Sequence, residues 1–436
     1  MNRILKSLSA LTLALILCLG AAAATFAEEA PEYITQAAIA KQFEMPHGTL
    51  VPDVTFEFQV SPVGVDGDKS QTAQDAMPKI GENGTEIVKI EFPQTKYTYT
   101  EQDGDTDIYY MESDELFGNV NWTHGGEYVY HIKEINKTYV STLTPKPQSE
   151  TLNYSNAEYE LTVLVGEDGK GGYEVIAIGA MRVVKEDGTT GDVKVDPTPG
   201  SVSIDNEYSQ MTFRNTYVKT NGGTDPKDDK DWTLSISKKV SGDFSDSGIY
   251  FDFLVKVSAP SLVSGTPTYN AYVVEKAETG YKVVTSNENG AISGSDAHGS
   301  FIAFESDEAQ TIHLKHGQTL VFVNTPVGSH YSVSESGTAA YVPSVTVIYD
   351  SENGIKYEHN TINMGQGLTI PSEGTIQGPL YVGEGKNSAD FDNQRDMVTP
   401  TGLNLNDLPF IAMIGIAVLS IAGYLLAKSR RARYDR

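Results

Sequence analysis

The sequence predicts an all-β protein built from two tandem antiparallel β-sandwich domains. Many short segments alternate apolar and polar residues, among them TFEFQV from Thr55, EYVYHIKEI from Glu127 and YFDFLVKV from Tyr250. This period of two is typical of antiparallel strands with one buried face. Turn residues bound these segments at the spacing of a β-sandwich. Between the two ends of the chain, no segment shows sustained helical periodicity.

The first 27 residues are predicted to be a secretory signal peptide. Arg3 and Lys6 precede an apolar run over residues 8–24, and small residues lead up to Ala27. A basic stretch, an apolar core and small residues in this order are typical of an export signal, with cleavage expected after Ala27. The alternative, a membrane anchor that is retained, requires a longer apolar segment with different flanks.

Cys18 is the only cysteine, and it lies inside that apolar run. The mature chain is therefore expected to contain no disulfide, no cysteine nucleophile, no thioester and no thiolate metal site. Leu17 directly precedes Cys18 where a lipoprotein signal requires a small residue, which argues against lipid attachment.

A polar linker is predicted between the two domains. Residues 219–230, KTNGGTDPKDDK, contain Gly-Gly and Pro and no apolar residue, a composition typical of a connecting segment. The linker separates a first domain over residues 31–218 from a second domain over residues 231–395. Each half opens with a lysine-bearing strand, continues with an F-x-F strand, later has a tyrosine strand ending in glutamate, and closes with F-x-N.

In the first half, strand alternation directs three polar side chains toward the apolar interior. Lys41 shares its face of the strand IAKQF with Ile39 and Phe43. Glu134 shares a face with the tyrosines of EYVYHIKEI, and Asn215 with the Phe and Tyr residues of MTFRNTY. Successive side chains of a strand point to opposite faces, so these three residues are expected inside.

The second half repeats the pattern. Lys238 shares a face with the apolar residues of LSISKKV, Glu335 with those of HYSVSE, and Asn393 with Phe391. Lys239 is expected to face solvent.

Three such groups in a dry interior favour one reaction. Burial lowers the pKa of an amine and raises that of a carboxylic acid, so both can be neutral together. A neutral amine can attack the carboxamide carbon while the acid polarises the carbonyl and relays protons, and ammonia leaves. The product is a Lys–Asn isopeptide bond, formed once per molecule without cofactor or turnover. Two ordinary roles stay open: an edge-strand lysine that opposes aggregation and a turn asparagine.

Near the C-terminus the chain carries the motif residues Val398, Thr399, Pro400, Thr401 and Gly402. A polar spacer follows, then an apolar span over residues 408–427 that is long enough to cross a bilayer, and a basic tail expected in the cytoplasm. Residues 398–436 in this order resemble the sorting signal of sortase substrates. The resemblance implies cleavage of the Thr401–Gly402 bond, although Val398 and Thr399 depart from the usual L-P-x-T-G pattern. A plain single-span membrane protein is the alternative.

The two domains also resemble a known family. IAKQFEMPHGTLVPDVTFEFQV, LFGNVNWTHGGEYVYHIKE and MTFRNTY are similar to the streptococcal FctA-type (T-antigen) major pilin domain. LSISKKVSGDF, LKHGQTLVFVNTPVGSHYSVSE and FDNQ resemble the isopeptide-linked Ig-like (Cna B-like) domains of such pilins. The resemblance implies two linkages with their catalytic acids: Lys41 to Asn215 with Glu134, and Lys238 to Asn393 with Glu335.

Other classes of site find little support. The formal net charge of −26 argues against nucleic acid as a partner. No metal-ligand spacing of histidines and no phosphate-binding glycine motif is present, so no metal is expected. DGDTD from Asp103 is interpreted as an acidic turn. Trp122 and Trp232 are interpreted as packing residues.

The sequence therefore predicts a secreted structural pilin subunit, anchored in the cell wall on the surface of a Gram-positive bacterium and not an enzyme. Its expected partners are a sortase and neighbouring subunits or peptidoglycan. The acceptor amine is not distinguished among Lys185, Lys194 and Lys219. The alternative is a monomeric wall-anchored adhesin or stalk that binds a host ligand. An extracellular hydrolase has no supporting residues.

Overall fold

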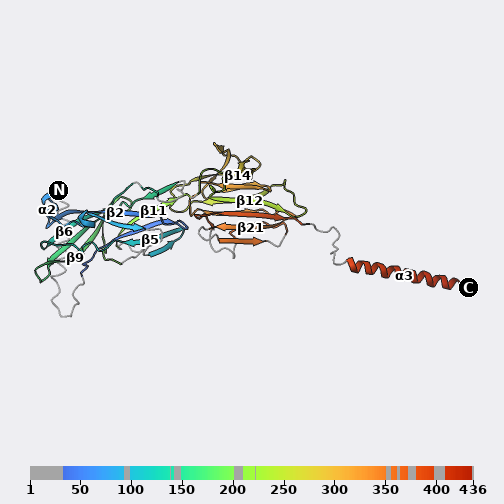
Figure 1. Ribbon diagram of the computed structural model, residues 1–436, viewed down its shortest axis with the longest axis horizontal. Helices are drawn as coiled ribbons and strands as arrows, with labels where there is room; N and C mark the ends of the chain where they lie inside the picture. The colour runs from blue at the N-terminus through green and yellow to red at the C-terminus, as the bar shows by residue number, and fades with distance from the viewer. Residues whose placement is uncertain are drawn as a thin grey trace.

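The computed structural model describes residues 33–92, 99–137, 139–141, 149–200, 210–220, 222–349, 355–360, 364–371, 380–396 and 408–434. The predicted signal peptide and the motif Val398–Gly402 lie outside these residues. The described part is nearly all β, which confirms the predicted fold class. Figure 1 shows the two sandwiches one after the other, with a long helix toward the C-terminus.

The first sandwich has two sheets that share one core. Its strands are β1 (Ile39–Pro46), β2 (Val54–Val65), β3 (Ile87–Phe92), β4 (Tyr99–Asp103), β5 (Thr106–Glu112), β6 (Gly126–Glu134), β7 (Glu150–Asn153), β8 (Glu158–Glu167), β9 (Tyr173–Val184), β10 (Thr190–Val195) and β11 (Met211–Lys219). One sheet has the order β4-β5-β1-β11-β7 and the other β10-β9-β8-β6-β2-β3.

Aromatic side chains join these two sheets. The ring of Phe43 on β1 lies 5.2 Å from that of Phe56 on β2 and 5.3 Å from that of Phe92 on β3, both edge-on. Trp122 is buried in the same core, as expected for a packing residue. The alternating pattern that predicted β2 and β6 thus reflects one face buried against the opposite sheet.

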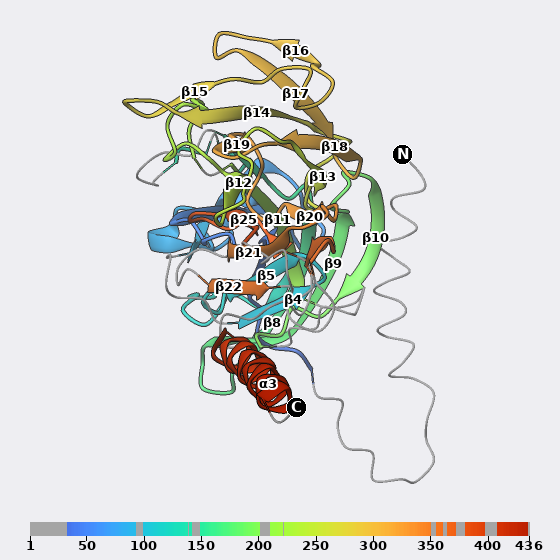
Figure 2. The same cartoon turned by 90° about the vertical axis from the view of Figure 1, so that its right-hand side faces the viewer.

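The second sandwich also consists of two sheets. Its strands are β12 (Leu234–Ser241), β13 (Phe251–Ser258), β14 (Thr268–Lys276), β15 (Tyr281–Val283), β16 (Gly294–Ser295), β17 (Ser300–Glu305), β18 (Ala309–Leu314), β19 (Gln318–Phe322), β20 (His330–Glu335), β21 (Val342–Tyr349), β22 (Ile355–Asn360), β23 (Leu368–Ile370), β24 (Leu380–Tyr381) and β25 (Ser388–Gln394). One sheet runs β16-β17-β14-β19-β12-β25-β21-β22, with β15 beside β14. The other runs β18-β13-β20-β23, with β24 beside β20. Figure 2 shows β14 to β17 on one side of this sandwich.

In both sandwiches the first strand pairs in parallel with the last. β1 pairs with β11 so that Lys41 lies opposite Phe213. β12 pairs with β25 so that Lys238 lies opposite Phe391. The asparagine of each sandwich is two residues further along its strand, on the same face as the phenylalanine. The two sandwiches therefore bring the amine and the carboxamide together with one and the same register.

The helices lie outside the sheets. α2 (Gln71–Ala76) is a single short helix whose first turn is capped by the Ser70 side chain, which accepts the Ala73 N–H at 3.3 Å. With six residues, it is too short to give the sequence a sustained helical periodicity. α3 (Leu408–Tyr434) contains an apolar stretch, Pro409–Lys428, with a mean hydropathy of 2.4, long and apolar enough to cross a membrane.

The segment predicted as a linker is hydrogen-bonded and lies against the second sandwich. The Asp231 carboxylate accepts the Thr224 and Asp225 N–H groups at 3.0 and 2.9 Å. The Trp232 ring packs 4.6 Å from the Tyr281 ring, and its Nε1 donates to Pro226 O at 2.9 Å. Trp232 is therefore a packing residue, and its contacts fold the segment back onto the sheet.

Contacts also join the two sandwiches directly. Lys219, the last residue of β11, forms an ion pair with Glu384 at 2.6 Å, and Glu384 accepts the Leu50 N–H at 2.8 Å. Asp105, in the turn between β4 and β5, accepts the Ser261 N–H at 2.8 Å. The DGDTD sequence is thus a hairpin turn whose acidic side chain contacts the second sandwich.

Candidate functional site

Each sandwich contains a buried lysine that its strand neighbours hold inside. Lys41 is 0% exposed and Lys238 is 2% exposed, although lysine is rarely found inside a protein unless it is paired. Lys239 is exposed, as its alternating position predicts, and its amine pairs with Asp392 at 2.8 Å.

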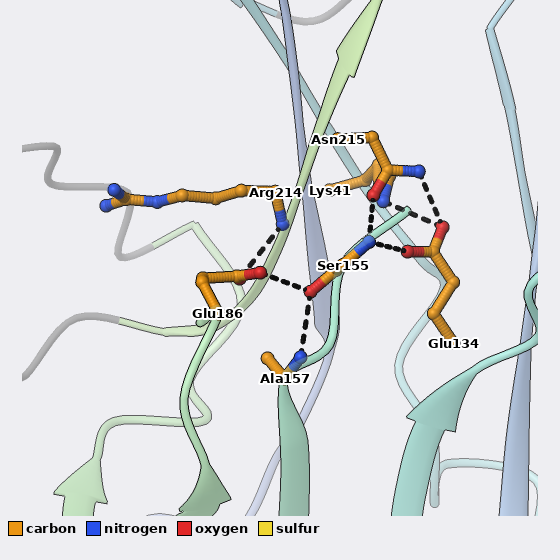
Figure 3. Close-up of polar contacts among 7 residues, drawn as sticks. All are labelled: Lys41, Glu134, Ser155, Ala157, Glu186, Arg214 and Asn215. Atoms are coloured by element: carbon orange, nitrogen blue, oxygen red, sulfur yellow. Dashed lines mark hydrogen bonds and ion pairs between the residues drawn. The ribbon is translucent and has the colours of Figure 1, made fainter. Parts of the chain in front are cut away.

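In the first sandwich the three predicted site residues meet. Lys41 Nζ donates to Glu134 Oε1 at 2.8 Å, and Asn215 Nδ2 donates to the same oxygen at 2.9 Å. Figure 3 shows the amine and the carboxamide side by side on this carboxylate. The glutamate therefore contacts both the nucleophile and the nitrogen that would leave.

The second sandwich repeats this arrangement. Lys238 Nζ donates to Glu335 Oε1 at 2.7 Å, and Asn393 Nδ2 donates to that oxygen at 2.8 Å. Lys238, Glu335 and Asn393 are all buried. The six side chains thus form two triads of the same geometry, one in each sandwich.

The F-x-F strands provide the apolar wall around each amine. Lys41 Nζ lies 4.4 Å from the centre of the Phe56 ring. Lys238 Nζ lies 4.2 Å from the centre of the Phe251 ring. Each acid is paired with the second phenylalanine of its F-x-F strand, Phe58 with Glu134 and Phe253 with Glu335. The sequence shows the F-x-F repeat, but its position beside the amine depends on how the two sheets pack.

Burial alters the protonation of these groups. Desolvation lowers the pKa of Lys41 and of Lys238 to about 8, against the opposing attraction of Glu134 and Glu335. Desolvation also raises the pKa of Glu335, although Lys238 opposes the shift. A lower amine pKa increases the neutral, nucleophilic fraction at neutral pH.

The two triads differ in what surrounds the carboxamide oxygen. In the first, the Ser155 N–H donates to Asn215 Oδ1 at 2.7 Å and to Glu134 Oε2 at 3.0 Å (Figure 3). In the second, the corresponding atoms Asn393 Oδ1 and Glu335 Oε2 are buried without a hydrogen-bond partner among the described residues. Strand periodicity could not predict Ser155, because it lies in the irregular segment between β7 and β8.

The arrangement can support amide exchange within the chain. The lysine amine can bond to the asparagine carboxamide carbon while the bond from that carbon to Nδ2 breaks. The glutamate can take a proton from the amine and deliver it to the leaving nitrogen, which departs as ammonia. Among the described residues, no group of three or more His, Cys, Asp or Glu side chains is placed to hold a metal ion.

Comparisons with known proteins identify the first sandwich. Residues 38–218 match the family model FctA, a Spy0128-like isopeptide-containing domain. Residues 232–366 match a domain of unknown function. No curated protein matches the chain.

Solved pilin structures align with the chain at low identity. The major pilin of Streptococcus pyogenes is 16% identical over 83% of this chain and 99% of its own, with a TM-score of 0.31. The S. pyogenes major pilin T-13 is 14% identical over 83% of this chain and 98% of its own, with a TM-score of 0.28. The family assignment therefore rests on the match of residues 38–218. The first sandwich, residues 38–218, therefore belongs to the FctA family of Spy0128-like isopeptide-containing domains.

Proposed function

We propose that the chain is a structural pilus subunit in which two self-formed isopeptide bonds, Lys41–Asn215 and Lys238–Asn393, tie the first strand of each sandwich to the last. The observation that carries the proposal is the pair of matched buried triads. Each has an amine and a carboxamide on one glutamate oxygen, within a dry aromatic wall. A purely structural role of these side chains would not require the same three residue types to meet in the same strand register in both sandwiches.

The stabilising effect of a plain ion pair does not account for the triads. A buried pair costs desolvation free energy that its attraction barely repays, so it is a weak source of stability. A covalent bond between the same residues instead constrains the unfolded chain, by about 5 kcal/mol for a loop of this length if disulfide values apply. It also gives a direct covalent path between the strands that enter and leave each sandwich.

The bonds are tested by the intact mass of the mature ectodomain. We expect a mass below that of the sequence by two ammonia molecules, and peptide mapping should locate one bond in each sandwich. Glu134→Ala and Glu335→Ala are each expected to restore one ammonia, because each removes the proton relay of one site. A mass equal to that of the plain sequence would exclude the cross-links.

Assembly into fibres is proposed to follow cleavage at Thr401 by a sortase, with a lysine of the next subunit as acceptor. Lys219 is poorly suited to that role, because its side chain is 3% exposed and paired with Glu384. Lys194 on β10 is exposed. Cell-wall extracts are expected to show a detergent-resistant ladder that Thr401→Ala abolishes. A single wall-linked band would favour a monomeric adhesin.

A further inference from the structure

We propose that Ser155 and Glu186 are positioning residues of the first triad. Glu186 holds the Ser155 segment so that the Ser155 backbone N–H stabilises the negative charge that develops on Asn215 Oδ1 when the Lys41 amine attacks. The inference deepens the isopeptide reaction proposed above and rests on it.

The Ser155 N–H is directed at the atom where charge develops. Its 2.7 Å contact with Asn215 Oδ1 is the one hydrogen bond to that oxygen among the described contacts. Fixed N–H donors at such a position are used for acyl transfer, where removing one costs about 10²–10³ in rate. The same N–H lies 3.0 Å from Glu134 Oε2, so it also orients the acid that relays protons.

A side-chain network holds this donor in place. Ser155 Oγ donates to Glu186 Oε2 at 2.6 Å and accepts the Ala157 N–H at 3.1 Å. Glu186 Oε1 accepts the Arg214 N–H at 3.1 Å. Arg214 directly precedes Asn215 on β11, so Glu186 connects the donor to the backbone of the strand that carries the acceptor (Figure 3).

The second triad provides the contrast within one molecule. Asn393 Oδ1 and Glu335 Oε2 are buried and have no hydrogen-bond partner among the described residues. There, the side chain in contact with the carboxamide that can supply a donor to its oxygen is Glu335 in its protonated form, and burial raises the pKa of this acid. The first site thus has a permanent donor, whereas the second depends on the protonation of its glutamate.

The chemical balance is the same at both sites. The bond from lysine Nζ to the asparagine Cγ forms, the bond from Cγ to Nδ2 breaks, and ammonia leaves. A proton passes from the amine through the glutamate to Nδ2. The Ser155 N–H keeps its proton throughout, and no oxidant or reductant is needed.

The test follows both reactions in the same molecules. The full mature chain, residues 28–436, is synthesised cell-free with detergent micelles, quenched in acid at intervals and digested. Each cross-linked peptide is then quantified, so the second site serves as an internal reference for folding. Ser155→Ala and Glu186→Ala are expected to slow the first site about tenfold or more while leaving the second unchanged.

Two controls separate positioning from general stability. Ser155→Thr retains the hydroxyl and is expected to react at nearly the wild-type rate. Thr189→Ala removes a hydroxyl bonded to Asp187 at 2.6 Å in the same turn as Glu186, and should leave the first site unaffected. If the first site cross-linked at the same rate in the wild type, Ser155→Ala and Glu186→Ala, the proposed positioning role would be wrong. The proposed isopeptide function would not be affected by that result.

The pH dependence of the cross-linking rate at each site distinguishes the proposed role from a purely structural one, which would not alter this dependence. In the wild type, the rate of cross-linking at the first site should rise with pH as the Lys41 amine deprotonates and then stay constant. The second site should pass through a maximum and fall as Glu335 deprotonates. Ser155→Pro, which lacks the N–H, is expected to give the first site a maximum as well. An unchanged profile in this variant would contradict the inference, and a wild-type chain with no cross-link at either site would overturn it together with the function.

Discussion

Lys41 and Lys238 are the residues on which the proposed cross-linking depends. Each amine contacts a carboxylate and a phenyl ring, with almost no exposure to solvent. A buried charged amine is costly, and burial therefore favours its neutral form. The same desolvation that makes these lysines unusual as core residues makes them usable as nucleophiles.

The rate of bond formation should depend on pH through these amines. At the pKa of about 8 that burial gives Lys41, about one amine in ten is neutral at pH 7, against about one in three thousand at the ordinary value. The first site is therefore expected to react about tenfold more slowly at pH 6 than at pH 7. The cell-free time course measures this directly. Equal rates at pH 6 and pH 7 would show that amine deprotonation does not limit the reaction.

At the scale of the strands, the parallel pairing of first and last strand sets the geometry of the proposed reaction. Lys238 lies opposite Phe391, two residues before Asn393. The lysine side chain must therefore lean along the strand to reach its partner, toward the glutamate on the facing sheet. Side-chain alternation predicted the inward faces of β6 and β11 from sequence. On β1 burial does not alternate, because Gln42 is buried as well as its neighbour Lys41.

Exchanging two residues of β12 tests this register. The double variant Lys238→Val, Val240→Lys keeps the composition and the inward face but moves the amine two residues, about 6.5 Å, along the strand. We expect it to lose the second cross-link and to retain the first, because the amine is displaced from Glu335. Peptide mapping measures both sites. A cross-link from position 240 to Asn393 at the wild-type rate would show that the offset register is not required.

At the scale of the whole molecule, the sandwiches are joined by a junction rich in charged and aromatic groups. The His47 ring of the first sandwich and the His330 ring of the second lie 5.0 and 4.5 Å from the Tyr381 ring. The ion pair between buried Lys219 and half-buried Glu384 lies at the same junction. Together with the two proposed bonds, such a junction would let tension pass along the chain without unfolding either sandwich.

Removing one charge of this junction should weaken it. Glu384→Gln leaves the buried Lys219 amine without its counter-charge and is expected to lower the free energy of unfolding by about 2–4 kcal/mol. The matched control Asp392→Asn disrupts the ion pair with the exposed Lys239. This control should change the free energy of unfolding by less than about 0.5 kcal/mol. Calorimetry of both variants measures the difference, with loss of coupled unfolding of the sandwiches expected only for Glu384→Gln. If both variants lowered the free energy of unfolding by similarly small amounts, the Lys219–Glu384 pair would not stabilise the junction.

The sequence by itself determined the β-sandwich class, the two repeats and the inward placement of the lysine, glutamate and asparagine side chains. It could do so because strand alternation is a local property that is visible in the order of residues. Only the tertiary structure decided that the Ser155 N–H contacts the first triad and that Glu186 contacts Ser155. It also decided that F-x-F rings line both amines and that the predicted linker packs on the second sandwich. Ser155, Glu186 and the linker lie in irregular segments, which carry no periodic signal. The F-x-F rings lie on strands, but their place beside the amines depends on how the two sheets pack.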